Sequence, residues 1–181
     1  MRMRSLCSAV TIASLVLLAG PAPSFGQQRG DDAERKSKNG ETTATIGGVD
    51  VRITYGRPQA RGRTVWGDLV PYDAVWRAGA DEATTITFSS DVTIEGQPLP
   101  AGTYALFTIP SQETWTVVFN KVAEQWGAYD YDESQDALRV QVQPTTGDHV
   151  EELTFSVEGN AVVLSWEKLR VPFKVEAGQA A

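Results

Sequence analysis

The segment from Tyr55 to Thr85, YGRPQARGRTVWGDLVPYDAVWRAGADEATT, concentrates charged and aromatic side chains without the periodicity of a strand or a helix. It holds four of the eleven arginines of the chain, two tryptophans and the acidic pair Asp81 and Glu82. A guanidinium group is a rigid fork of donors that suits a carboxylate, phosphate or sulfate. Aromatic faces beside planar polar groups are typical of sugar-binding sites. The segment therefore predicts a pocket for a small anionic or carbohydrate-like ligand.

Eight residues are the candidates for binding this ligand: Tyr55, Arg57, Arg63, Trp76, Arg77, Glu82, Trp126 and Tyr129. Trp126 and Tyr129 flank a glycine, so their rings form either a stacking platform or a cap over the open end of the core. The arginines also have a structural interpretation, because a long irregular connection leaves backbone carbonyls that arginines can satisfy. In that interpretation, Arg77 pairs with Glu82 and pins the connection across one end of the fold.

Carboxylates are the main candidates for catalysis. Glu82 or Asp81 would act as acid or base, and Arg77 would stabilise developing negative charge, as in an envelope hydrolase or lyase. The single histidine, His149, lies in a turn-like stretch, and no serine stands in a nucleophile-elbow pattern. These residues favour a non-catalytic binding domain without a cofactor. A third interpretation is a structural or protein-interaction domain with no small-molecule ligand.

An alternating series of oxygen-bearing side chains resembles part of a calcium loop: Asp130, Asp132, Ser134 and Asp136. Position six of this loop is Gln135 instead of glycine, and position twelve is Gln141 instead of glutamate. The pattern therefore favours a solvated acidic turn, and no metal site is predicted. A single histidine cannot form a histidine-rich zinc or copper site.

The first 26 residues have the pattern of a secretory signal peptide. Arg2 and Arg4 precede an apolar run that is too short for a membrane span, and small residues precede a cleavage site after Gly26. We therefore expect an exported protein, periplasmic or secreted, with no membrane span once the signal is removed. Cys7, the only cysteine, belongs to this signal, so no disulfide is expected. The net charge of −7 argues against nucleic acid as a partner. No oligomeric state is predicted.

The rest of the chain must position these groups. Residues 27–40 are polar and predict a disordered leader, and residues 177–181 a loose tail. Between them, residues 41–176 form one domain of short segments rich in β-branched and aromatic residues. The segments expected as strands are 42–46, 49–55, 83–88, 92–94, 103–109, 115–119, 138–142, 153–157, 161–166 and 171–175, and the glycines and prolines of residues 95–102 indicate turns. This pattern predicts an all-β fold, a single antiparallel jelly-roll-like β-sandwich of about nine short strands with one long irregular connection. Gly47-Gly48 predicts a two-residue hairpin turn.

The string from Tyr55 to Thr85 resembles the hallmark of the exported domain-of-unknown-function 2911 family. So do LPAGTYALFTIP, WTVVFNK, QWGAYDYDES and LSWEKLRVPF, which follow in order through nearly the whole domain. The resemblance implies a single exported β-rich domain, and it transfers no catalytic residue. Members of the family often carry asparagine where this chain has Asp81, so this additional carboxylate beside Glu82 would alter the local charge.

Overall fold

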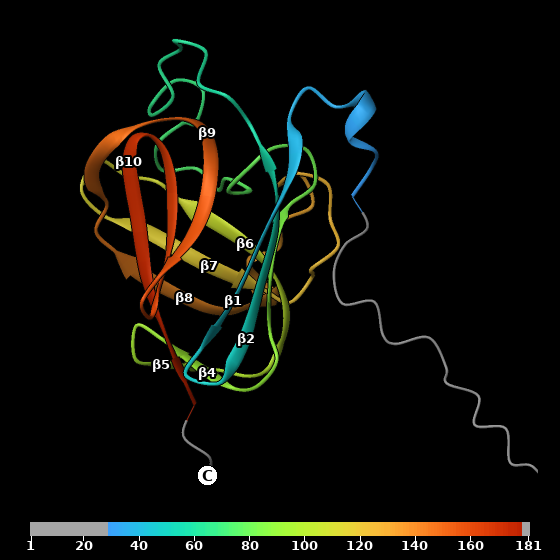
Figure 1. Ribbon diagram of the computed structural model, residues 1–181, viewed down its shortest axis with the longest axis vertical. Coiled ribbons are helices and arrows are strands. Elements are labelled where there is room, and N and C mark those ends of the chain that lie inside the picture. The colour runs from blue at the N-terminus through green and yellow to red at the C-terminus, as the bar shows by residue number, and fades with distance from the viewer. Residues whose placement is uncertain (1–28, 179–181) are drawn as a thin grey trace, which may run out of the picture.

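The computed structural model describes residues 29–178, so the predicted signal peptide lies outside the described residues (Figure 1). Within this range the chain forms ten strands and two short 3-10 turns, without an α-helix. The strands are β1 (Lys38–Ile46), β2 (Val49–Arg57), β3 (Thr84–Phe88), β4 (Val92–Ile94), β5 (Gln97–Leu99), β6 (Gly102–Ile109), β7 (Trp115–Asn120), β8 (Asp136–Val142), β9 (Thr145–Glu158) and β10 (Ala161–Ala177). The 3-10 turns are η1 (Asp32–Glu34) and η2 (Glu133–Gln135). Among residues 29–178, no helix has the length and apolar character needed to cross a membrane.

Two antiparallel sheets pack against each other, which confirms the predicted all-β sandwich. One sheet has six strands in the order β1-β2-β3-β6-β7-β8, and the other has four in the order β5-β4-β10-β9. The teal and green connection between β2 and β3 lies at one end of the sandwich (Figure 1). The arginine-rich connection is therefore irregular, as predicted, and the strands hold both of its ends.

Two tight hairpins follow from residues that adopt a positive φ. Gly47 and Gly48, with φ of 56° and 86°, join β1 to β2, as their sequence predicts. Glu95 and Gly96, with φ of 48° and 79°, join β4 to β5. The glycine and proline content of residues 95–102 predicted only turns here, whereas the chain also forms the short strand β5, which contains Pro98. β5 lies at the edge of its sheet, where a missing backbone donor is tolerated.

The last two strands are longer than expected. The segments 161–166 and 171–175 fuse into β10, which pairs with β9 and, at its C-terminal end, with β4. The register shifts on both sides of Glu167, which has a φ of 54°. This irregularity lets one strand continue through residues that the sequence pattern indicated as a break.

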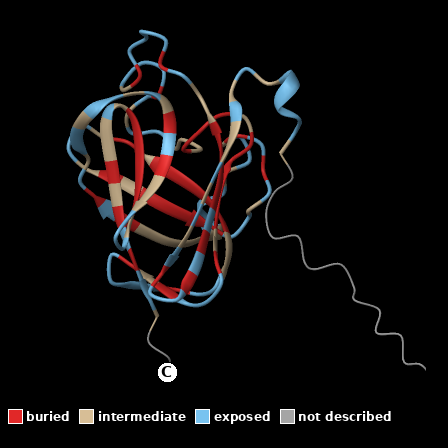
Figure 2. Cartoon of the chain, viewed as in Figure 1, coloured by how far each residue is buried: buried red, intermediate tan, exposed pale blue. Residues whose placement is uncertain are grey.

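The buried residues, drawn in red in Figure 2, lie mainly on the strands of the two sheets. The largest fully buried rings of the main core are Trp115, Trp166, Phe88 and Phe119. A small second cluster lies on the outer face of the six-stranded sheet and comprises Ala83, Ala105, Phe107 and Val118. Val75 of the connection and Ala128 and Tyr131 of the β7–β8 loop pack against it. These two loops therefore cover the outer face and lie close to each other.

The polar segment predicted as a disordered leader is, from Arg29 onward, part of the folded domain. It forms η1, and β1 begins at Lys38 instead of at Thr42. Asp31 caps the turn by accepting a hydrogen bond from the Ala33 amide at 2.9 Å. The segment has no apolar face, and its attachment is electrostatic. At the other end of the chain, Gly178 donates to the Asp91 carbonyl at 2.7 Å.

Candidate functional site

The connection from Pro58 to Ala83 joins β2 to β3, two neighbouring strands of the six-stranded sheet, and contacts both sheets at one end of the sandwich. Near its start, the Ala60 amide donates to the Glu151 carbonyl on β9 at 2.8 Å. Further along, Trp76 and Thr108 on β6 exchange two backbone hydrogen bonds of 2.7 and 2.8 Å. The irregular backbone thus forms hydrogen bonds with strands of both sheets, because the polar backbone groups of a long loop need hydrogen-bond partners.

Backbone strain concentrates in this connection. Six non-glycine residues among positions 29–178 have a positive φ, and four of them lie here: Arg61, Asp73, Ala78 and Asp81. Each such conformation costs on the order of 1 kcal/mol, and strain of this kind clusters at functional sites. The turn also approaches β2 closely, since a side chain at Gly56 would clash with the carbonyl oxygen of Ala80. The position of residues 77–82 is therefore set by contact with the sheet.

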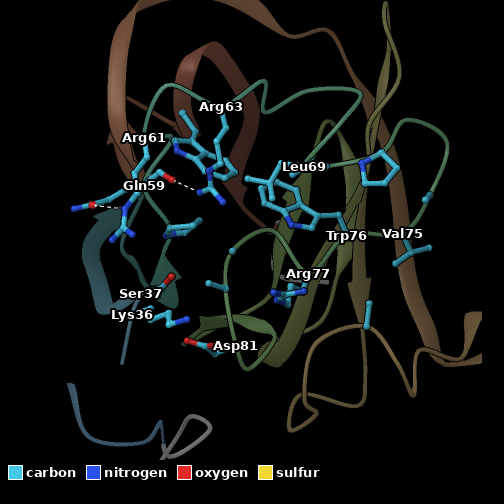
Figure 3. Close-up of a pocket in the computed structure, with 18 of the residues that line it drawn as sticks. Lys36, Ser37, Gln59, Arg61, Arg63, Leu69, Val75, Trp76, Arg77 and Asp81 are labelled. Carbon is cyan, nitrogen blue, oxygen red and sulfur yellow. Dashed lines mark hydrogen bonds between the residues drawn. The ribbon is translucent and has the colours of Figure 1, made fainter. Parts of the chain in front are cut away.

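A cavity of about 760 Å³ opens beside this strained turn. Figure 3 shows Arg61 and Arg63 above it, Lys36 and Asp81 below it, and Leu69 and Trp76 to the right. Its wall comes from four parts of the chain: the N-terminal segment, the connection, the β7–β8 loop and β10. The lining residues are Lys36, Ser37, Pro58, Gln59, Arg61, Arg63, Leu69, Val70, Pro71, Ala74, Val75, Trp76, Arg77, Gly79, Ala80, Asp81, Ala128, Tyr129 and Trp166.

The charge of this wall is opposite to that of the whole protein. Among residues 29–178, four cationic side chains line the cavity, and Asp81 is the only carboxylate that does so. The chain as a whole carries a net charge of −7. A cleft lined by one sign of charge attracts ligands of the opposite sign. This arrangement can hold an anion.

Arg77 differs from the other arginines of the wall in its hydrogen bonds. Arg63 donates to the carbonyls of Ala60 at 3.0 Å and Gln59 at 2.5 Å, and Arg61 donates to the Gln59 side chain at 3.2 Å. The Nε atom of Arg77 is buried and has no hydrogen-bond partner within residues 29–178. A buried donor without a partner costs about 1–3 kcal/mol. Arg77 therefore lines the cavity with a guanidinium whose buried Nε atom is not satisfied by the described chain.

Four of the five tryptophans form one cluster at the inner side of the cavity. Trp66 makes edge contacts with Trp76, Trp115 and Trp166, with ring centroids 4.9 to 5.7 Å apart. Trp76 and Trp166 are nearly parallel, with centroids 6.0 Å apart, and both line the cavity. Trp166 is only 1% exposed, so the partly buried ring of Trp76 is the main aromatic surface that shares the wall with the cationic groups.

Glu82 lies on the opposite side of the same turn and does not line the cavity. Its side chain is only 7% exposed, and two arginines of the N-terminal segment hold it. Arg35 binds both carboxylate oxygens, and Arg29 approaches the carboxylate at 3.3 Å. Gly30 adds a backbone hydrogen bond of 3.2 Å. The expected pair of Glu82 with Arg77 is absent among the interactions of the described chain, because Arg29 and Arg35 take this place.

Hydrogen bonds determine the charge of Glu82. Burial raises the pKa of its carboxyl group, but the hydrogen bonds from Arg35, from its own amide and from Gly30, with the charge of Arg29, lower this pKa to about 2. A carboxyl group with this pKa is ionised at neutral pH and cannot donate a proton there. Asp81, the other proposed acid, lies in the cavity wall and 3.3 Å from Arg35.

The structure brings together some of the predicted ligand-binding residues and separates others. Arg63, Trp76, Arg77 and Tyr129 line the cavity, the last with 84% of its surface exposed. Three other candidates lie elsewhere. Tyr55 is buried between the sheets, where its hydroxyl accepts a hydrogen bond from Phe155, and Arg57 pairs with Glu152 at 3.3 Å. Trp126 is 55% exposed and pairs through its backbone with Glu82.

The acidic series after Tyr129 is occupied by structural hydrogen bonds. Asp132 accepts from the Ser134 amide at 2.9 Å and caps η2. Asp136 accepts from Tyr131 and from Arg139, each at 2.6 Å. Burial and the hydrogen bond to Asp136 raise the pKa of Tyr131 to about 12. In the described part of the chain, no three histidine, cysteine, aspartate or glutamate side chains gather into a possible metal site.

Four residues of this region were not identified from the sequence. Lys36 and Trp166 line the cavity, and Arg29 and Arg35 bind Glu82. Trp166 ended a predicted strand and therefore indicated core packing. The N-terminal residues lay in a stretch without apolar side chains, which indicated disorder. The one signal that favoured their attachment was the uncompensated acidic pair at positions 81 and 82.

Comparison with protein-family models matches residues 37–175 to the family described as Protein of unknown function (DUF2911). The match begins one residue before β1 and includes the entire connection. It confirms the resemblance seen in the sequence. Comparisons with curated proteins and with solved structures find no match.

Proposed function

The chain belongs to the DUF2911 family, and from the geometry of its site we propose that it binds a small anionic, ring-bearing ligand in the basic cavity without transforming it. A sugar acid such as a hexuronate is the class that suits this wall. Its carboxylate would bind at Arg77, and its ring would lie against Trp76. The volume of about 760 Å³ is within the range of small-molecule sites.

The observation that carries the proposal is the gathering of four cations with one carboxylate among the described residues of one cavity wall, where Arg77 also has a buried Nε atom without a partner. Natural proteins rarely leave a buried donor without a partner, so such a group needs an explanation. An anionic ligand beside the Arg77 guanidinium provides one, because it would balance the charge of this side chain and of the wall around it. The strained backbone of this turn supports the same conclusion.

The state of Glu82 favours binding over catalysis. A hydrolase or lyase that used this residue as an acid would need a raised pKa and access to the ligand. The pKa of Glu82 is instead lowered, because its hydrogen bonds and the arginine charges outweigh burial, and the carboxylate lies outside the cavity wall.

Calorimetric titration with glucuronate, glucose and inorganic phosphate tests the proposal. We expect glucuronate to bind more tightly than glucose, because the cavity recognises negative charge. Arg77→Met should weaken glucuronate binding about 10- to 100-fold, the value of one charge-assisted hydrogen bond. The matched control is Arg52→Met, which removes an arginine from an exposed pair with Glu41. The absence of glucuronate binding, or equal binding by Arg77→Met, would overturn the proposal.

Export is also part of the proposed function. The signal-like pattern of the first 26 residues supports a site that acts outside the cytoplasm, on an envelope or extracellular compound. N-terminal sequencing of the protein from its native cell should give Gln27 as the first residue. A mature chain that retains Arg2 and Arg4 would contradict export by this route.

A further inference from the structure

The N-terminal segment from Arg29 to Ser37, called the strap below, contacts both sides of the turn that carries Arg77, Asp81 and Glu82. On one side, Arg29 and Arg35 bind the Glu82 carboxylate. On the other side, Lys36 and Ser37 form part of the cavity wall. Arg29 also donates to the carbonyls of Ala80 and Ala83 at 2.9 and 3.2 Å. The strap therefore holds the backbone of the turn as well as its charges.

The strap reverses the local charge. Without it, the turn would present the two carboxylates Asp81 and Glu82 against the single cation Arg77. The strap supplies Arg29 and Arg35 to the carboxylates and Lys36 to the cavity. Its own acidic residues, Asp31, Asp32 and Glu34, are exposed around η1. The end of the cavity is thus cationic only while the strap is in place.

Arg77 is close enough to this group of charges to be affected by it. Its carbonyl accepts a hydrogen bond from the Thr84 amide at 3.3 Å, which closes the turn around Asp81 and Glu82. Burial lowers the pKa of Arg29, and the charge of Arg77 contributes to this lowering. Arg77 and the strap arginines thus belong to one group of charges, in which only the strap arginines bind the two carboxylates in the described chain.

We propose that Arg29 and Arg35 are positioning residues for the anion site. By satisfying Glu82, they keep Arg77 unpaired and available to a ligand. When the strap leaves, Arg77 pairs with Glu82, and the cavity, which has then lost Lys36 and the free charge of Arg77, binds anions more weakly. The strap then acts as a removable part of the wall that determines how tightly the site binds. This inference rests on the proposed function for its ligand, but its central claim concerns the partner of Arg77.

A measurement without ligand tests that claim. Arg77→Met and Glu82→Gln are introduced singly and together. This set is made once with the native strap and once with a strap that carries Arg29→Gln and Arg35→Gln. The unfolding equilibrium of each protein is measured in urea. With the native strap, the two changes should be independent. With the substituted strap, they should couple by about 10-fold or more in the unfolding equilibrium constant, because Arg77 and Glu82 would then form a pair. If the protein with both strap substitutions does not fold, the cycle is measured with Arg35→Gln as the only strap substitution.

A second measurement, titration with glucuronate, tests the consequence for binding. The substituted strap should lower the affinity about 10-fold or more, and adding Glu82→Gln should restore it to within about 3-fold, because the competing carboxylate is gone. A merely structural strap would not be rescued in this way. Absence of coupling, or undiminished binding by the substituted strap, would overturn the inference. If the unaltered protein binds no glucuronate, the proposed function fails, and the ligand-free measurement still decides the role of the strap.

Discussion

Arg35 and Arg77 are two arginines beside the same acidic pair, and their surroundings differ. The Arg35 side chain is 10% exposed and binds both oxygens of Glu82. Arg77 has a buried Nε atom without a partner and faces a cavity. The first arginine is part of the fold, because its charge is balanced inside the protein. The second keeps an unused donor, which is a cost to the free protein and a gain when an anion binds.

The same residue type, arginine, therefore has opposite roles on the two sides of one turn. Inside a protein, a buried ion pair holds two parts of the chain together. An unpaired buried charge is unfavourable, and a ligand of opposite charge relieves this cost when it binds. Each of the following predictions tests one side of this contrast.

The largest effect is expected at the paired side. Arg35→Met should lower the free energy of unfolding by about 3 to 5 kcal/mol, because it leaves the buried Glu82 carboxylate with only Arg29. Urea denaturation measures this loss. Arg52→Met is the control, since its side chain is 47% exposed in the pair with Glu41, and such pairs contribute about 0–1 kcal/mol. If Arg35→Met and Arg52→Met were equally stable, Arg35 would not be a structural arginine, and its contrast with Arg77 would fail.

The stability of the fold at low pH should also depend on the ion pair between Glu82 and Arg35. The folded protein lowers the pKa of Glu82 from 4.5 to about 2, since its hydrogen bonds and the charge of Arg29 together outweigh burial. A carboxyl group with a depressed pKa contributes stability that is present above the unfolded pKa and is lost as the pH falls through the folded pKa. We expect a loss on the order of 3 kcal/mol between about pH 4.5 and 2. Unfolding at a series of pH values should show this loss in the native protein and a flatter profile in Glu82→Gln. Parallel profiles would contradict the assignment.

Arg77→Met should have a much smaller effect on stability. The change removes a buried donor that has no partner, so the free energy of unfolding should stay within about 1 kcal/mol of the native value or rise. The same urea experiment measures it. A loss as large as that of Arg35→Met would show that Arg77 is also a structural arginine.

The smallest effect is expected for Asp81→Asn. Asparagine tolerates the positive φ of 62° at this position, so stability should change by about 0.5 kcal/mol or less. Removing the only carboxylate of the cavity wall should raise the affinity for glucuronate about 3- to 5-fold. Calorimetry measures the change. Weaker binding by Asp81→Asn would indicate that the carboxylate itself contacts the ligand.

The sequence predicted the fold well where local rules dominate. The Gly47-Gly48 hairpin follows from residues that accept a positive φ, and the strand at Val92–Ile94 has the expected bounds. β5 was missed because Pro98 is acceptable only at an edge, and edge position is a property of the assembled sheet. The long β10 was missed because an irregularity at Glu167 resembles the end of a strand.

The site was predicted only in part, for the same reason. Trp76 and Arg77 were identified because they lie in one unusual segment of the sequence. The pairing of Arg35 with Glu82 joins residues 47 positions apart and depends on charge, which leaves no periodic pattern. A stretch without apolar residues predicts disorder because it cannot bury a hydrophobic face. Residues 29–37 are attached instead by buried ion pairs.

The stacked indoles at the cavity give this protein an optical signal of its own. The rings of Trp76 and Trp166 lie 15° from parallel with centroids 6.0 Å apart, a separation at which the electronic transitions of two indoles couple. Both rings line the cavity, so a ligand between them and the arginines would change their emission and their circular dichroism in the near ultraviolet. Occupancy of the site can therefore be followed by light, with no attached dye and before the natural ligand is known.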